Sequence, residues 1–465
     1  MAESRSFSPS PRSTFRDPAG SVEIKADGAY RRIRSPFDAE ILAFLALPVA
    51  SELVADGRLV ASEVISRDPD SKTLVLRHPR ISFQSYPWEW PPALWLAAAE
   101  LTLNLCSDLI KQGWLLKDAT PLNVLFRGME PVFVDVLSIE RAAPDRPLWI
   151  AYGQFVRTFL LPMLAHSQLG WPLQVALMRR DGYEPEEIFT ALSWPARLSQ
   201  PALSAVTLPS LLARKAKGNS NLAARTVKDP DLAKQIILKT LDRLLSRMRQ
   251  VTPAHRSSTW TDYAETATHY GEDDHSRKRA FVTCALAASK PARVLDVGCN
   301  TGVYSLLAAD AGAEVVSIDT DLQTVDHLCA KLRGSEKNIL PLCVDLAYPT
   351  PAVGWENSET ASFLSRCSGH FDTVMMLAVI HHLLLQAQIP MDRIATLCSD
   401  LTTENLILEW VPPSDVKFRE LLRGRDEIYA YLSEGLFRDA FARYFRVVSE
   451  VTLSNGRILL HFERR

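Results

Sequence analysis

The sequence predicts an α/β protein whose C-terminal part forms a doubly wound, mostly parallel seven-stranded sheet that ends in an antiparallel hairpin. Three observations lead to this fold class. Runs of buried-strand character alternate with helical segments beyond residue 290, which is typical of a parallel sheet covered by helices. A glycine-containing turn follows the first of these strands directly. Near the C-terminus, two β-rich runs flank Asn455-Gly456, a strong hairpin signal.

The composition is that of a globular chain too long for one core. The 465 residues are 47% hydrophobic and 23% charged, and chains of this length divide into two or three domains. We expect a disordered tail at 1–20, an α+β domain at 21–205, a basic helical linker at 206–258 and the α/β domain at 259–465. The linker has apolar residues at helical spacing, the pattern of an amphipathic connecting helix, and binding of RNA or of a partner is the alternative.

Charge and cysteine content exclude several classes of protein. The net charge is -2, from 52 basic and 54 acidic residues, so no global basic field attracts long nucleic acid or an anionic membrane. Seven scattered cysteines without a C-x-x-C pair predict reduced thiols in a cytoplasmic protein. We expect no membrane span, because the most apolar stretch, 92–106, is short and carries Glu100. The oligomeric state stays open.

The most informative string is VLDVGCNTG, residues 294–302, a buried strand that enters a glycine turn before a helix. Gly298 and Gly302 permit a tight turn and close approach of a ligand to the backbone, and the helix start presents free N–H groups. Asn300 and Val303 stand where a dinucleotide fingerprint requires other residues, so that class of cofactor is excluded. The P-loop pattern for phosphates is also absent from this string.

The residues Asp296, Gly298, Asn300 and Gly302 resemble the first motif of the class I, Rossmann-like S-adenosylmethionine-dependent methyltransferases, with Asn300 in place of the middle glycine. The resemblance covers roughly residues 260–465. It implies S-adenosylmethionine as the cofactor, with Asp296 attracting its ammonium group and the free backbone N–H groups binding its carboxylate.

Two further acids extend this resemblance. Asp319 ends the next strand, where an acid can bind ribose hydroxyls. Asp345 ends the strand after that, a position that faces the adenine amino group in the family, and Leu346 would contact the adenine ring. Each acid alone is also explained as a strand end or helix cap. Three acids at successive strand ends, beside the glycine turn, favour the cofactor site.

The candidate catalytic residues are His381, His382 and Glu409. The two histidines follow the fourth strand, where a neutral imidazole can take a proton from an acceptor hydroxyl; capping or core packing is the alternative. Glu409 ends the fifth strand and is a second candidate for orientation or proton transfer, with a salt bridge to an arginine as its alternative. The fourth strand lacks the N/D-P-P-Y pattern for nucleobase amines. Three residues upstream are candidates for closing over the cofactor: Tyr263, Tyr270 and Lys278.

The N-terminal part carries Asp118 and Asn123, in D-x-x-x-x-N spacing, and then Asp135. This spacing resembles the catalytic loop and metal-binding aspartate of kinases, including small-molecule phosphotransferases. The resemblance implies that Asp118 orients an acceptor hydroxyl and that Asn123 and Asp135 hold magnesium. A glycine-rich phosphate loop is missing, and Arg31 or Arg32 would have to replace the usual lysine. The alternative is that these side chains stabilise a turn and a strand end.

The whole layout resembles bacterial two-part methyltransferases known as nodulation proteins, through the segments at 354–359, 377–383 and 409–415. We therefore predict an S-adenosylmethionine-dependent methyltransferase that acts on an oxygen or nitrogen nucleophile of a small-molecule, sugar or glycolipid acceptor. Two alternatives stay open. One is a bifunctional protein with an ATP-dependent N-terminal kinase-like activity, and the other is a regulatory scaffold that binds S-adenosylmethionine.

Overall fold

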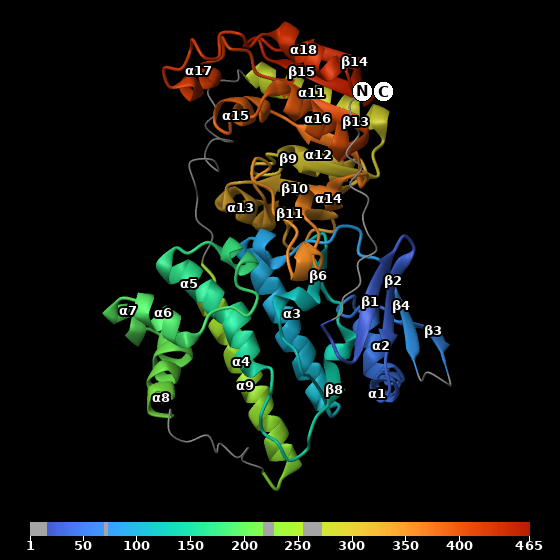
Figure 1. The fold of residues 1–465 in the computed structure, drawn as a ribbon, viewed down its shortest axis with the longest axis vertical. Helices are drawn as coiled ribbons and strands as arrows, with labels where there is room; N and C mark the ends of the chain where they lie inside the picture. Colours follow the sequence, from blue (N-terminus) through green and yellow to red (C-terminus); the bar gives the residue numbers. More distant parts are fainter. Residues whose placement is uncertain (1–15, 69–72, 217–226, 254–271) are drawn as a thin grey trace. The chain divides into compact units, whose positions relative to one another are not determined.

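The computed structural model describes residues 16–68, 73–216, 227–253 and 272–465. They form two compact units, and the chain passes from one unit to the other between residues 254 and 255 (Figure 1). Most of the expected tail, the domain boundary predicted at 258, and the candidates Tyr263 and Tyr270 lie outside the described residues.

The C-terminal unit is built on a seven-stranded sheet with the order β11-β10-β9-β12-β13-β15-β14 (Figure 1). Its strands are β9 (Arg293–Val297), β10 (Glu314–Asp319), β11 (Ile339–Cys343), β12 (Phe371–Met376), β13 (Thr402–Trp410), β14 (Phe445–Thr452) and β15 (Ile458–Arg464). The strands β9 to β13 pair parallel with one another, whereas β15 pairs antiparallel with both β13 and β14. The mostly parallel α/β sheet that the strand–helix alternation predicts is therefore present.

The strand order of this sheet determines where a ligand can bind. Going along the chain, β9, β10 and β11 extend the sheet in one direction, and β12 then returns to the other side of β9. In open α/β sheets, ligands bind at the carboxyl ends of the strands where the order reverses in this way. The helices of the unit are α11 (Glu272–Ser289), α12 (Val303–Asp310), α13 (Leu322–Leu332), α14 (Phe363–Cys367), α15 (Ile380–Leu385), α16 (Met391–Leu401), α17 (Val416–Leu422) and α18 (Glu434–Ala442).

The core of the C-terminal unit lies around its central strands. β11 is buried along its whole length, as expected for an apolar strand covered on both faces. The predicted hairpin is confirmed at the end of the chain: the N–H of Leu453 donates to the Arg457 carbonyl over 2.8 Å, and Gly456 has φ +81° between them. Asn-Gly suits this turn because glycine adopts positive φ without strain.

The N-terminal unit contains a four-stranded antiparallel sheet with the order β1-β2-β4-β3 and two small antiparallel pairs, β5 with β8 and the hairpin of β6 with β7. Its strands are β1 (Gly20–Lys25), β2 (Gly28–Ile33), β3 (Glu63–Arg67), β4 (Leu74–His78), β5 (Trp114–Leu116), β6 (Val124–Arg127), β7 (Glu130–Phe133) and β8 (Ile139–Arg141). Its α-helices are α1 (Phe37–Leu45), α2 (Pro48–Ala55), α3 (Pro92–Lys111), α4 (Tyr152–Phe155), α5 (Leu161–Leu169), α6 (Pro185–Ala191), α7 (Trp194–Leu198), α8 (Leu208–Ala216) and α9 (Pro230–Val251).

The helix α9 differs from the free connecting helix that its basic, amphipathic sequence predicts. Its apolar face, which includes Ile237, Leu241 and Leu244, is buried in packing against α3. Leu232, expected on the same face, is half exposed. The helix belongs to the N-terminal unit because burial of an apolar stripe stabilises a helix far more than its own propensity does.

The helix α3 is the core helix of the N-terminal unit. Among the described residues it has the length and apolar composition of a membrane-spanning helix, and 61% of its apolar window is buried inside the protein. Trp95 and Leu105 on this helix are completely buried. The seven cysteines form no disulfide, and six of them are buried.

Candidate cofactor and acceptor site

The turn after β9 has a shape that requires its two glycines. Gly298 has φ +69°, and a Cβ atom on it would lie 2.5 Å from Cγ2 of Val379, in the segment after β12. Gly302 has φ +78°, and its Cβ would lie 2.3 Å from Cδ1 of Leu328. Asn300 also has positive φ, at +49°, a conformation that asparagine tolerates better than most residues. The departure from the family motif is thus accommodated by the backbone.

Asp319, at the end of β10, is hydrogen-bonded to this turn. Its carboxylate accepts from the N–H of Asn300 over 2.9 Å and from the N–H of Asp321 over 3.0 Å. Burial raises the pKa of Asp319, and these backbone hydrogen bonds oppose the rise. Each carboxylate oxygen has a second lone pair, so the side chain can still accept from ribose hydroxyls.

Asp296, the last but one residue of β9, is 2% exposed. It accepts a hydrogen bond of 2.6 Å from the Ser305 hydroxyl, which in turn accepts from Ser317 over 2.9 Å. Burial raises the pKa of Asp296 to about 6, although the bond from Ser305 lowers it. The nearby charge of Lys278 also lowers this pKa, whereas that of Asp319 raises it. A buried carboxylate of this kind is stabilised by an opposite charge, such as the ammonium group of a methionine tail.

Asp345 and Leu346 follow the end of β11 after a single intervening residue, Val344. The Asp345 carboxylate accepts from the N–H of Ala347 over 2.8 Å and is half buried, while Leu346 is buried. The structure thus places the acids 296, 319 and 345 at the carboxyl ends of three adjacent strands.

His381 and His382 lie in α15, immediately after β12, with their ring centroids 4.3 Å apart. Nδ1 of His382 is hydrogen-bonded to Oε1 of Gln386 over 3.0 Å. His381 is 3% exposed, and its buried Nδ1 has no hydrogen-bond partner among the described residues. Burial lowers the pKa of His381 to about 3, with His382 and Arg457 adding to the effect. The ring is therefore neutral, and it suits a hydrogen-bonding role better than that of a strong base.

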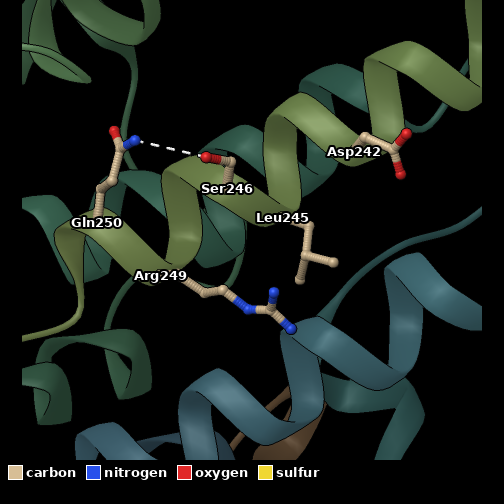
Figure 2. A pocket seen from close by; sticks show the side chains of 5 residues that line it. All are labelled: Asp242, Leu245, Ser246, Arg249 and Gln250. Atoms are coloured by element: carbon tan, nitrogen blue, oxygen red, sulfur yellow. Dashed lines mark hydrogen bonds between the residues drawn. The ribbon is translucent and has the colours of Figure 1, made fainter.

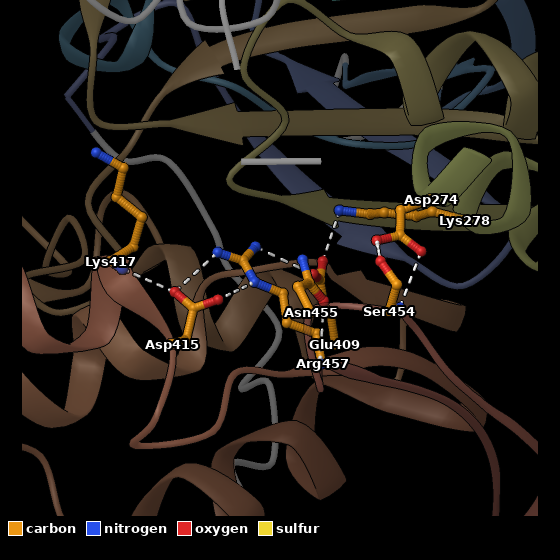
Figure 3. A network of polar contacts seen from close by, with 8 residues as sticks. All are labelled: Asp274, Lys278, Glu409, Asp415, Lys417, Ser454, Asn455 and Arg457. Atoms are coloured by element: carbon orange, nitrogen blue, oxygen red, sulfur yellow. Dashed lines mark hydrogen bonds and ion pairs between the residues drawn. The ribbon is translucent and has the colours of Figure 1, made fainter. Parts of the chain in front are cut away.

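Glu409, the last but one residue of β13, lies in a buried network of charges (Figure 3). One of its oxygens is 2.5 Å from Nζ of Lys278, on α11, and the other is 3.2 Å from Nη1 of Arg457, on the turn before β15. Arg457 also pairs with Asp415, the N-cap of α17, over 2.8 and 3.1 Å. Two cations and two anions thus balance one another, and both Glu409 oxygens are held by cations.

The network joins several elements around the carboxyl edge of the sheet. On α11, one turn before Lys278, Asp274 accepts from the N–H and hydroxyl of Ser454, at the β14–β15 turn, over 3.0 and 2.5 Å (Figure 3). Nζ of Lys278 also lies 5.0 Å from the centre of the Tyr304 ring. Sequence reasoning missed Arg457, although a charged residue directly before an apolar strand was a signal for it.

The structure also brings together the candidate metal residues of the N-terminal unit. Nδ2 of Asn123 donates to the Ser138 hydroxyl over 3.1 Å, and this hydroxyl donates to Asp135 over 2.5 Å. The other oxygen of Asp135 is 2.7 Å from Nη1 of Arg31. Asp118 is half buried, and burial raises its pKa, with the charge of Asp135 adding to the effect.

A hollow of about 470 Å³ lies in the N-terminal unit, along one face of α9 (Figure 2). It contains none of the candidate site residues. Arg249 on its wall forms an ion pair with Glu100 over 2.7 Å. Because its lining comes from successive turns of one helix, we regard it as a surface groove. The residues that line it are Asp242, Leu245, Ser246, Arg249 and Gln250.

Comparison with known proteins identifies the chain. Residues 270–415 match a family described as "Methyltransferase domain". The nodulation protein NoeA of Rhizobium meliloti (strain 1021) is 31% identical over 493 residues, an alignment that covers 100% of this chain and 99% of NoeA. The chain belongs to the NoeA family. The C-terminal unit of this NoeA-family protein contains a methyltransferase domain.

Solved structures resemble this NoeA-family protein only at low scores. N-methyltransferase NodS from Bradyrhizobium japonicum WM9 is 13% identical and covers 42% of this chain and 97% of its own, with a TM-score of 0.31. Magnesium protoporphyrin IX methyltransferase from Synechocystis PCC 6803 is 19% identical, with 49% and 94% covered and a TM-score of 0.32. The bifunctional kinase-methyltransferase WbdD is 19% identical, with 42% and 39% covered and a TM-score of 0.30. Scores of this size carry no argument about the acceptor.

Proposed function

We propose that the protein transfers a methyl group from S-adenosylmethionine to an oxygen or nitrogen nucleophile of a small-molecule, sugar or glycolipid acceptor. The observation that carries the proposal is the placement of Asp296, Asp319 and Asp345 at adjacent strand ends around a turn that admits only glycine at 298 and 302. Bound S-adenosylmethionine would supply an electrophilic methyl group on a sulfonium.

The residues of the chain fit this cofactor. Asp296 would pair with its ammonium, because an opposite charge stabilises the ionised form of a buried carboxylate. Asp319 would accept from the ribose hydroxyls, and Asp345 with Leu346 would contact the adenine. The N–H groups of Val303 and Tyr304, at the start of α12, would bind the carboxylate of the methionine tail, since the helix has no side-chain cap.

The acceptor would lie beside His381, whose unpaired Nδ1 can accept a hydrogen bond from an O–H or N–H group. A neutral ring at this position orients the nucleophile, and its burial excludes water from the reacting atoms. His382 is oriented by Gln386 and is the second candidate. Glu409 would act by holding Lys278 and Arg457 in place, because a carboxylate paired with two cations does not readily take a proton.

The test is calorimetric titration of the full chain with S-adenosylmethionine and S-adenosylhomocysteine, with Asp319→Ala as the site variant. Asp321→Ala is a matched control, because Asp321 caps α13 at the same strand end. Micromolar binding that Asp319→Ala abolishes and Asp321→Ala retains supports the proposal and leads to an acceptor screen. Absence of binding to both compounds by the wild type refutes it.

Two alternatives give other results in the same experiment. Binding without turnover of any acceptor in the screen would favour a regulatory scaffold. Binding of magnesium-ATP that Asp135→Ala removes would favour a second, kinase-like activity of the N-terminal unit. We place the protein in the cytoplasm, in keeping with seven scattered cysteines that lack a C-x-x-C pair.

A further inference from the structure

Arg31 lies in the interior of the N-terminal unit, on β2, and its side chain is 9% exposed. In the antiparallel register, His78 on β4 lies opposite Ala29 on β2. Because Ala29 and Arg31 are two positions apart on one strand, Arg31 and His78 lie on the same face of the sheet. Nη1 of Arg31 pairs with Oδ1 of Asp135 over 2.7 Å, and Nη2 donates to the carbonyl of Val134 over 3.2 Å. The guanidinium is therefore held at two points of the segment that follows β7.

The other atoms around Asp135 are also engaged. Its second oxygen accepts from the Ser138 hydroxyl, and Ser138 accepts from the amide of Asn123. Magnesium takes oxygen ligands in strict octahedral geometry, commonly with one or two carboxylates. Here one oxygen of the shared carboxylate is paired with the Arg31 guanidinium and the other accepts from Ser138, so a divalent cation at this carboxylate would meet a positive charge already in place. The described residues also contain no group of three or more His, Cys, Asp or Glu side chains that could hold a metal. The residues present do not fit the magnesium that the kinase resemblance implies.

We propose that Arg31 is the resident cation of this site, so that its guanidinium takes the place at Asp135 that a divalent metal would otherwise occupy. The N-terminal unit is then metal-independent, and Asn123, Ser138 and Asp135 form an internal polar junction. A metal ion could reach Asp135 only by displacing Arg31, whose charge would stay behind in a buried position.

The surroundings make this displacement unfavourable. Nε of Arg31 is buried without a hydrogen-bond partner among the described residues, and a displaced guanidinium would lose its ion pair with Asp135 as well. Burial and the charge of Arg31 hold the pKa of His78 at about 4, and a neutral ring offers no compensating charge. Breaking a buried ion pair of this kind is expected to weaken metal binding roughly 100-fold.

The experiment is titration of the full chain with Mn²⁺, read by the loss of the free-ion signal in electron paramagnetic resonance. The wild type should bind no Mn²⁺ at this site up to about millimolar concentration, whereas Arg31→Ala should gain one site with affinity about 100-fold higher. Adding Asp135→Asn to Arg31→Ala should remove that site. Arg32→Ala is the matched control, because Arg32 is the exposed neighbour on the same strand.

Arg31→Met covers the case in which the alanine variant does not fold, because methionine retains much of the packing of the arginine stem. Circular dichroism of each variant establishes that it is folded. A wild-type site for Mn²⁺ that Asp135→Asn removes would overturn the proposal. Folded Arg31→Ala or Arg31→Met without a new Mn²⁺ site would overturn it as well. Neither outcome depends on methyl transfer, which concerns the other unit.

Discussion

Replacing Asp296 by asparagine should stabilise the cofactor-free C-terminal unit at neutral pH. Burial moves the pKa of this carboxyl from 3.8 to about 6 in the folded protein. The shift is about 2 pKa units, and at 1.36 kcal/mol per unit it corresponds to about 3 kcal/mol. Because the folded-state pKa is raised, the stability contribution of the carboxyl is complete below about pH 4 and is lost as the pH rises through about 6.

Asparagine does not titrate, and its side-chain carbonyl can still accept from the Ser305 hydroxyl. The advantage of Asp296→Asn over wild type should therefore be small near pH 4 and should reach about 3 kcal/mol above pH 7. Urea unfolding of the full chain, followed by hydrogen exchange of peptides from β9 and β10, measures the difference within this unit. Asp273→Asn, at an exposed position on α11, controls for the general pH dependence of unfolding.

In cofactor binding, by contrast, the wild type should be favoured over the Asp296→Asn variant. If Asp296 pairs with the cofactor ammonium, S-adenosylmethionine should bind the asparagine variant at least about tenfold more weakly at pH 7. The reasoning is refuted if the variant has no stability advantage at pH 8, or an equal one at pH 5 and pH 8. An unchanged affinity would refute the assignment of Asp296 to the ammonium alone.

Three further predictions concern the rest of the C-terminal site. Gly302→Ala should weaken S-adenosylmethionine binding at least about tenfold and cost about 1–3 kcal/mol of stability, since the new Cβ would collide with Leu328; normal affinity and melting temperature would contradict this. Arg457→Met should lower the free energy of unfolding in urea by about 3–5 kcal/mol, because it leaves Glu409 with less compensating charge. The double variant with Glu409→Gln should lose less stability than the sum of the losses of the two single variants. Additive losses would argue against coupling between the two residues. His381 should keep a neutral ring from pH 5 to pH 8, because its pKa is about 3, so its ring resonances in a nuclear magnetic resonance titration should not move; an inflection near pH 6.5 would show that the ring is not buried as described.

The fold of the C-terminal unit could be predicted well from the sequence, because its signals are local. Each buried strand is a short apolar run, and the turn at Asn455-Gly456 specifies a hairpin within a few residues. The location of the cofactor residues follows from the same strings, since an acid at the end of a parallel strand must lie at the carboxyl edge of the sheet. Their roles toward the cofactor and the acceptor stay predictions until the binding experiments are made.

The helix α9 shows where local signals were insufficient. Its periodicity predicted an amphipathic helix, and the helix is present. The pattern does not say which surface the apolar face meets, so the sequence alone predicts a linker here. Packing against α3 places α9 in the N-terminal unit, because an amphipathic helix is stabilised by the apolar surface that the fold brings against it.

By itself, the sequence determined the sheet, the glycine turn and the order of the three strand-end acids, because each of these depends on residues that are close together in the chain. The tertiary structure alone decided the charge partners. Lys278 and Glu409 are 131 positions apart, Arg457 and Glu409 are 48 apart, and Arg31 and Asp135 are 104 apart. A buried ion pair depends on the mutual placement of elements and on the exclusion of water, and no local pattern of residues encodes either of these.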